Sequence, residues 1–168
     1  MILMPIPEND FDPSETSIPW RILKENQIEI EFATPNGSPG NADPKMLTGE
    51  TLGILKPALM AGKDARSDYA EMIQDPKFQN PIRYDQISSG SYKGILLPGG
   101  HAKGMRPYLE SKILQDTIVH FFDQNKPVGA ICHGVLLVAR SIDPKSKKSV
   151  LYDFQTTSLL KAQELFAY

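Results

Sequence analysis

The chain has 168 residues, of which 40% are hydrophobic, and carries 18 Lys and Arg against 20 Asp and Glu. This length suits one domain with its own hydrophobic core, and a formal net charge of −2 argues against binding to nucleic acid. No apolar stretch approaches the roughly 20 residues that span a bilayer, and the first residues lack the features of a signal peptide. A single cysteine, Cys132, excludes an internal disulfide and suits a reducing compartment. We therefore expect a soluble cytoplasmic protein without membrane or nucleic-acid partners.

The first 37 residues predict a strand, a helix and a second strand. The apolar run 2–6 is typical of a buried strand that opens into a loop. Ser14 is a candidate N-cap for a helix that extends to residue 26, and Pro19 marks either its true first turn or a kink. Residues 28–32 alternate between apolar and polar, which predicts a strand.

The remainder of the chain continues this alternation after an irregular segment. Residues 38–86 are rich in Pro and Gly and predict a loop-rich insertion with short helical pieces within one domain of residues 1–168. The elements expected beyond it are strands at 94–97, 126–131 and 147–152, and helices at 111–125, 135–141 and 158–168.

Strands that alternate with helices predict an α/β fold. The strands are short and apolar, so we expect a doubly wound, mostly parallel sheet between two helical layers, in a three-layer α/β/α arrangement. Ligands bind such sheets at the carboxyl ends of the strands. Here the loops at residues 5–7, 98–100 and 131–132 should converge there.

Cys132 lies between a predicted strand and a predicted helix, in the sequence Ala130-Ile-Cys-His-Gly134. Small residues two positions before and after a nucleophile permit the sharp turn of a nucleophile elbow. A helix that begins next to the sulfur favours the thiolate. The amide of His133 could then hold an oxyanion, with a second donor from the turn Gly99-Gly100. A lone cysteine is more often a small buried hydrophobe, but this strand, turn and helix context favours a nucleophile.

Three other residues are candidates for the same site. His133 could act as a base or orient the thiol, and His101 could line the pocket or be a solvated loop residue. Glu15 could cap its helix, or it could share a hydrogen bond with the sulfur and so tune the pKa of the thiol. His120 lies in the middle of a predicted helix and is interpreted as structural. No metal-ligand spacing or phosphate loop occurs, so we predict no metal and no cofactor.

The sequence resembles the ThiJ/PfpI family of the class I glutamine amidotransferase-like superfamily, especially its chaperone-like glyoxalase III and deglycase branch. The resemblance covers nearly the whole chain and is carried by residues 4–7, 11–15, 32–37, 97–101 and 130–134 in family order. It implies a flavodoxin-like fold. It also implies that Cys132 is the nucleophile, Glu15 the carboxyl that hydrogen-bonds its sulfur, and Gly100 and His133 the oxyanion donors.

The resemblance implies a cysteine-dependent enzyme acting on small reactive aldehydes or glycated substrates, or a related deglycase or peptidase-like hydrolase. The alternative is a non-enzymatic stress-response chaperone or an oxidation sensor in which Cys132 becomes sulfinic acid. Glutaminase activity is not expected, because no His-x-Glu pair follows Cys132, and the third acid of a triad is not identifiable.

The resemblance also bears on the end of the chain. Relatives of this type run on through a further strand and helix, whereas the stretch up to Tyr168 has no capping Gly or Asn. We therefore expect either a fragment that lacks C-terminal elements or a homodimer that covers the exposed surface, with a naturally short variant as the alternative.

Overall fold

The computed structural model describes residues 1–50, 53–56 and 60–157. Its main sheet has five parallel strands in the order β5-β3-β1-β6-β7. These strands are β1 (Ile2–Pro5), β3 (Ile30–Thr34), β5 (Ile82–Arg83), β6 (Gly94–Leu97) and β7 (Val128–Ala130). A second, two-stranded sheet pairs β2 (Asn9–Phe11) with β4 (Asn41–Ala42).

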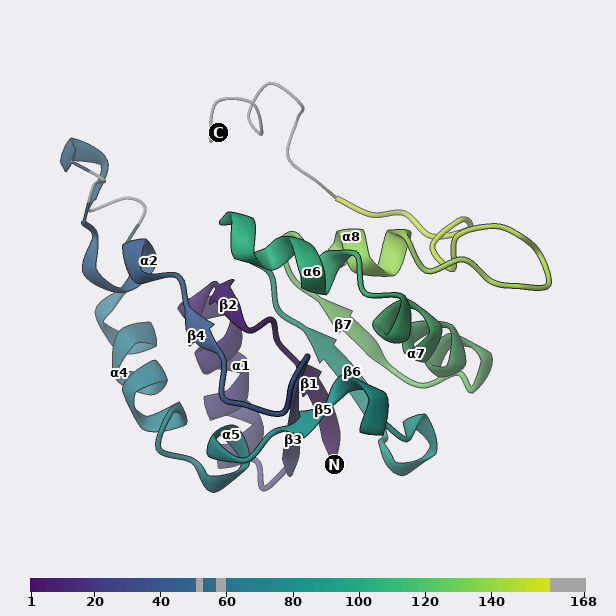
Figure 1. Cartoon of the computed structure of the whole chain (residues 1–168), viewed down its shortest axis with the longest axis horizontal. Helices are drawn as coiled ribbons and strands as arrows, with labels where there is room; N and C mark the ends of the chain where they lie inside the picture. Colours follow the sequence, from purple (N-terminus) through teal and green to yellow (C-terminus); the bar gives the residue numbers. More distant parts are fainter. Residues whose placement is uncertain (51–52, 57–59, 158–168) are drawn as a thin grey trace.

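The helices fall into two groups, one on each side of the middle of the sheet (Figure 1). The group beside β3 and β5 contains α1 (Pro13–Glu25), α2 (Pro44–Thr48), α4 (Lys63–Met72) and α5 (Pro76–Gln79). The group beside β6 and β7 contains α6 (Arg106–Leu109), α7 (Lys112–Asp123) and α8 (Gly134–Ala139). Short 3₁₀ turns are η1 (Gly53–Leu55), η2 (Tyr84–Gln86), η3 (Ser89–Ser91) and η4 (Lys103–Met105).

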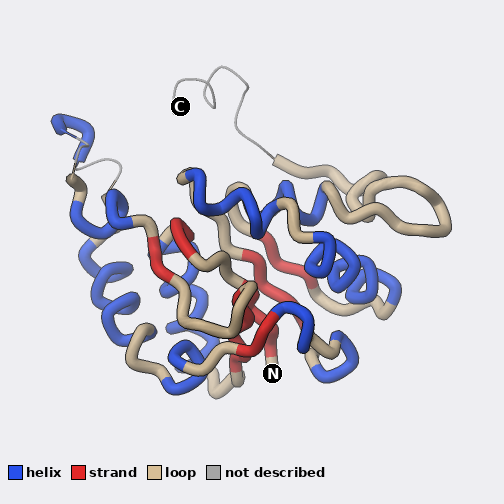
Figure 2. The backbone as a smooth tube through the Cα atoms, in the orientation of Figure 1, coloured by secondary structure: helices blue, strands red, loops and turns tan. Residues whose placement is uncertain are grey.

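The parallel sheet with helices on both faces is the predicted flavodoxin-like, doubly wound α/β fold. From β1 the chain moves outward to β3 and β5, then crosses back to β6 on the other side of β1 and continues to β7. Right-handed crossovers in opposite directions place α1 and α7 on opposite faces of the sheet. The direction reverses between β1 and β6, and ligands bind such sheets beyond the strand ends at this switch point. Figure 2 shows the loops that leave these strands on the same side of the sheet.

Three local predictions need correction. Helix α1 is capped by Asp12 and not by Ser14, because the Asp12 carboxylate accepts from the amides of Ser14 and Glu15. Pro13 then takes the first helical position, where its missing N–H costs nothing. The helix continues through Pro19, and β3 begins and ends two residues later than predicted.

The third correction concerns residues 147–152, which do not form a strand. The described chain contains only an isolated antiparallel bridge there, between Ile142 and Ser149, followed by turns. Lysines at 145, 147 and 148 and the left-handed conformation of Lys147 favour a solvated turn over a strand. The helix predicted at 158–168 lies outside the described residues.

Aromatic side chains from both halves of the chain fill the core. Phe32 of β3 is fully buried and meets Phe78 of α5 edge to face, with ring centroids 5.2 Å apart. Trp20 of α1 and Phe121 of α7 are also buried, one from each helical group. Burial of each such side chain stabilises the fold by roughly 2 to 3 kcal/mol, so the two layers are held to one sheet.

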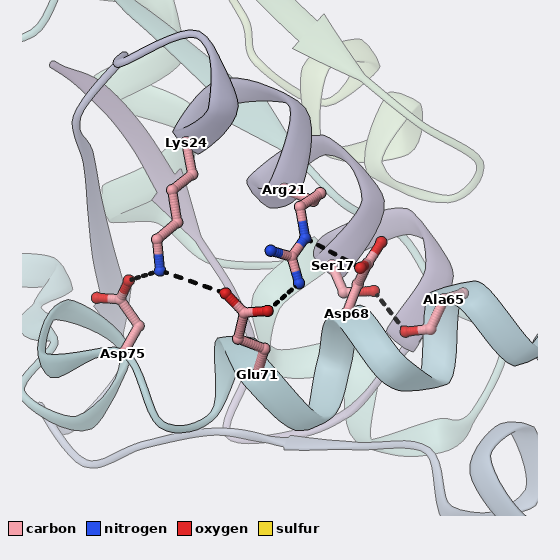
Figure 3. Close-up of polar contacts among 7 residues, drawn as sticks. All are labelled: Ser17, Arg21, Lys24, Ala65, Asp68, Glu71 and Asp75. Carbon is pink, nitrogen blue, oxygen red and sulfur yellow. Dashed lines mark hydrogen bonds and ion pairs between the residues drawn. The ribbon is translucent and has the colours of Figure 1, made fainter.

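The segment predicted as an insertion, residues 38–86, contributes directly to this framework. It supplies the edge strand β5 and the helix α4, which packs along α1. Figure 3 shows the contact: Arg21 of α1 pairs with Asp68 at 3.0 Å and also with Glu71, and the buried Ser17 Oγ donates to the Ala65 carbonyl at 2.9 Å. Lys24 reaches Glu71 and Asp75 of the same layer. These contacts fix the helix that carries Glu15.

Candidate active site

Cys132 stands at a sharp turn between β7 and α8. The Ile131 amide extends the sheet by donating to the Leu97 carbonyl at 3.0 Å, and the Gly134 amide then turns back to the Ile131 carbonyl at 2.8 Å. Cys132 between them has a φ of 50°, a left-handed conformation that costs a non-glycine residue roughly 1 to 2 kcal/mol. The turn exposes the thiol to solvent. This is the sharp turn of the predicted nucleophile elbow, which requires small residues on either side of the nucleophile.

Gly134 shows why a small residue is needed in this turn. A Cβ atom at Gly134 would lie 2.3 Å from the Leu97 carbonyl oxygen and 2.9 Å from that of Pro98. Any larger residue would therefore push α8 away from the end of β6.

Gly99 is the point where the chain segments after β2, β6 and β7 meet. Its carbonyl accepts from the Asp12 amide at 2.9 Å, and its own amide donates to Glu15 Oε2 at 2.8 Å. A Cβ at Gly99 would approach the Ile131 oxygen and the His133 nitrogen within 2.7 and 2.8 Å. Only glycine therefore lets the three loops come this close.

Glu15 does not serve as the helix cap. The spacing of Asp12 and Glu15 matches a capping box, in which the second side chain bonds back to the amide of the first residue. Here that amide is taken by the Gly99 carbonyl, while the Glu15 carboxyl accepts from the Gly99 amide. Because Asp12 alone caps the helix, the Glu15 carboxyl is available to the elbow.

Burial raises the pKa of the Glu15 carboxyl, and the negative charge of Asp12 adds to the rise. Three contacts act in the opposite direction: the Gly99 amide, a hydrogen bond with the Cys132 thiol, and the charge of His101. Glu15 is thus coupled to the sulfur and is easier to protonate than an ordinary glutamate.

Two histidines flank the sulfur. His133 Nδ1 lies 3.5 Å from Cys132 Sγ, and His101 Nε2 lies 3.9 Å from it. Their rings meet edge to face, with centroids 4.9 Å apart. Cys132, His101 and His133 form a group whose ligand-type atoms all lie within 4.8 Å of one another. Such a group can relay protons to and from sulfur, and it also has the donor set of a metal site, although no motif spacing predicted one.

A cavity of about 1450 Å³ opens in front of the thiol. It is lined by residues of the elbow, of the loop that carries His101, and of α6 and α8. Leu109 and Leu136 contribute apolar surface, and Lys103, Arg106 and Arg140 contribute positive charge. The cavity is large enough for a small substrate together with water.

The structure therefore brings together Cys132, His133, His101, Glu15 and the glycine turn. Within the turn, the Gly99 amide donates to Glu15 Oε2, which leaves the predicted oxyanion donor to Gly100. Gly100 has a φ of 155°, and a Cβ atom at this position would lie 2.7 Å from the Asp10 carbonyl oxygen, so both observations require glycine. His120 lies apart on α7, where its Nδ1 contacts the Asp116 carbonyl at 2.7 Å.

Three supporting residues were missed from the sequence. Asp12 caps α1 and holds the Gly99 turn, Asp10 accepts from the Gly104 amide at 2.8 Å, and the buried Tyr108 donates to the Pro98 carbonyl at 3.1 Å. An Asp followed by Pro is typical of a helix start, so the sequence could have predicted Asp12 as the N-cap. The partners of Asp10 and Tyr108 are long-range or irregular backbone atoms, which no sequence pattern marks.

Comparisons with known proteins show the family of the chain. A family model described as "ThiJ/PfpI family-like" matches residues 6–168, and the chain therefore belongs to the ThiJ/PfpI family. The glutathione-independent glyoxalase hsp3102 of Schizosaccharomyces pombe is 26% identical over 153 residues, which cover 90% of this chain and 60% of that protein. The chain thus spans less than two thirds of this relative's length.

Solved structures support the same fold. A rapid encystment protein of 24 kDa from Francisella tularensis superposes with a TM-score of 0.72 and 19% identity, covering 99% of this chain and 72% of that one. Glyoxalase III from Candida albicans superposes with a TM-score of 0.64 and 17% identity, covering 89% of this chain and 64% of that one. Within the residues that the structure describes, no helix has the length and hydropathy to cross a membrane.

Proposed function

We propose that the chain is a cysteine-dependent enzyme that acts on small reactive aldehydes, a cofactor-free glyoxalase that converts methylglyoxal to lactate. The observation that carries the proposal is the exposed Cys132 thiol in a left-handed elbow, flanked by two imidazoles and coupled to the Glu15 carboxyl. The glyoxalase name of the Schizosaccharomyces pombe relative supports the same reaction class.

The reaction begins when the Cys132 thiolate adds to the aldehyde carbon and forms a hemithioacetal. An imidazole or the Glu15 carboxylate removes the proton from that carbon, giving an enediol, and a proton is delivered to the neighbouring carbon. The product is a thioester of lactate, which water hydrolyses to lactate while the thiolate is released. One carbon is oxidised and its neighbour reduced, so the substrate supplies both electrons and water is the only co-reactant.

Each group in the site is proposed to act in one of these reaction steps. The raised pKa of Glu15 suits a carboxyl that gains and loses a proton during turnover. Nδ1 of His133 and Nε2 of His101 lie 3.5 and 3.9 Å from the sulfur and can accept the thiol proton. The amides of His133 and Gly100 are proposed to hold the developing oxyanion.

The test is lactate formation from methylglyoxal by the wild type and by Cys132→Ser and Cys132→Ala. We expect both variants to lose at least about a hundredfold in rate, since covalent catalysis and its proton transfers depend on the thiol. His120→Ala is the matched control and should retain activity, because that histidine lies outside the site. Turnover that survives Cys132→Ala would contradict the proposal. A parallel panel of glycated amines, amides and peptides distinguishes deglycase and peptidase-like hydrolysis.

A non-enzymatic role as an oxidation sensor or stress-response chaperone is the second candidate. It is favoured by the exposure of the thiol next to a protonatable carboxyl, which could hydrogen-bond a sulfinic acid. Absence of turnover on every substrate, together with stoichiometric oxidation of Cys132 by dilute peroxide, would favour this role.

A further inference from the structure

Cys132, His101 and His133 bring three metal-ligating side chains together, with ligand atoms within 4.8 Å of one another. With a zinc to sulfur bond of about 2.3 Å and zinc to nitrogen bonds of about 2.05 Å, the sulfur and nitrogen ligands of one ion lie about 3.6 Å apart. The two sulfur to nitrogen distances here are 3.5 and 3.9 Å. The three ligand atoms all lie within 4.8 Å of one another, and two nitrogens on one tetrahedral ion lie about 3.3 Å apart, so rotation of the histidine side chains would complete the set.

The chemistry of the donors selects the kind of ion. One thiolate and two imidazoles suit Zn²⁺ and its relatives Co²⁺ and Cu²⁺, whereas Mg²⁺ and Ca²⁺ require oxygen ligands. Cys132 and His101 are exposed and border the large cavity, so an ion can enter from solvent. Three protein ligands leave the fourth tetrahedral position for water.

We propose that Cys132, His101 and His133 form a binding site for a borderline-soft divalent cation such as Zn²⁺, and that the ion inhibits the thiol. When the ion binds, the thiol proton leaves to solvent and a sulfur lone pair forms the bond to the metal. No electron is transferred, and removal of the ion restores the site. The same lone pair is then unavailable to an electrophile, so metal and aldehyde compete for one atom. Only this last consequence, inhibition of turnover, rests on the proposed function.

Cobalt provides a direct probe of the site, because a cysteine ligand gives a thiolate-to-cobalt charge-transfer band in the near ultraviolet. Since Cys132 is the only cysteine, that band can arise from no other residue. Titration of the wild-type chain with Co²⁺ should reach one equivalent per chain, and Zn²⁺ should displace the cobalt. Cys132→Ser should abolish the band.

The histidines are tested by three matched variants, since the chain has three histidines and one lies elsewhere. His101→Ala and His133→Ala should each weaken Co²⁺ binding by at least about tenfold, because even residues behind a metal ligand cost 10 to 100-fold when removed. His120→Ala should bind like the wild type. A band that keeps its intensity and affinity in both His101→Ala and His133→Ala would overturn the proposal, as would the absence of the band in the wild type.

Alkylation by iodoacetamide gives a readout that needs no substrate. One equivalent of Zn²⁺ should slow the alkylation of Cys132 at least tenfold, a chelator should restore the rate, and Mg²⁺ should have no effect. Equal rates with and without Zn²⁺ would contradict the inhibitory role.

The metal site and the glyoxalase function can fail separately. If Zn²⁺ binds and protects the thiol but no aldehyde is turned over, the metal site stands and the glyoxalase function falls. If turnover depends on Cys132 but Co²⁺ gives no charge-transfer band, the metal site falls and the glyoxalase function stands.

Discussion

Two residues of the site depart from what their local sequence favours. Cys132 is held in a left-handed conformation, which a residue with a Cβ atom adopts only when the surrounding structure requires it. Glu15 occupies the last position of a capping box, yet its carboxyl bonds the Gly99 amide and interacts with the thiol. Both departures place a reactive group at the end of the sheet at some cost in stability.

If the left-handed turn is strained, glycine at that position should stabilise the fold. We expect Cys132→Gly to gain about 1 kcal/mol, or roughly 2 to 4 °C in melting temperature for a chain of this size, while activity is lost. Cys132→Ala keeps the Cβ and the strain, so it should not show the gain. Thermal unfolding of the three proteins checks this, and a lower melting temperature for the glycine variant than for the alanine variant would contradict it.

The raised pKa of Glu15 makes stability depend on pH. A carboxyl whose pKa is higher in the folded than in the unfolded state favours folding when protonated, so stability falls as pH rises from near 4.5 through the raised value. Glu15→Gln cannot ionise, and its stability relative to the wild type should therefore increase across that range. Urea unfolding at a series of pH values measures the difference. Glu25→Gln, an exposed carboxylate at the other end of α1, is the control and should not reproduce the trend.

At the scale of elements, the site depends on how closely α8 approaches the end of β6. The six-residue helix α8 starts at Gly134, directly against the carbonyl groups of Leu97 and Pro98. The buried Tyr108 of α6 holds the Pro98 carbonyl from the other side. The position of Cys132 is thus set by the close approach of two elements that are far apart in the sequence, the end of β6 at Leu97 and the start of α8 at Gly134.

A methyl group at this contact should be costly. Gly134→Ala would place a Cβ 2.3 Å from the Leu97 oxygen, and we expect a loss of about 3 kcal/mol, or roughly 6 to 12 °C in melting temperature. Gly90→Ala is the matched control, because a Cβ there meets nothing within 4 Å, and it should change stability by less than about 0.5 kcal/mol. Equal melting temperatures for the two variants would show that α8 can shift without cost.

At the scale of the whole molecule, exposed apolar side chains gather after α8. Tyr152 and Phe154 are 63% and 60% exposed, and Ile142 is 48% exposed. Strand β7 is the outermost strand of the sheet in the described part of the chain. Exposed apolar side chains and outer strands of a sheet are both common places for one protein to meet another.

We therefore expect the chain to self-associate, most simply as a homodimer. Light scattering should give a mass at or above that of two chains, and replacing Tyr152 and Phe154 with Ser should lower it. A well-behaved monomer that melts cooperatively and binds little apolar dye would contradict this expectation.

The sequence by itself determined the fold class and most of the site. Periodic apolar runs marked the strands that became β1, β6 and β7, and the small residues around Cys132 marked the elbow, because both signals depend on neighbours along the chain. Contacts between distant segments could not be predicted from the sequence and are known only from the tertiary structure. Only the folded chain shows that the Gly99 amide bonds Glu15, that residues 147–152 remain a turn, and that His101 reaches a sulfur 31 residues away. These outcomes depend on which backbone and side-chain atoms meet at the ends of the strands, and that is decided by how the helices and loops pack.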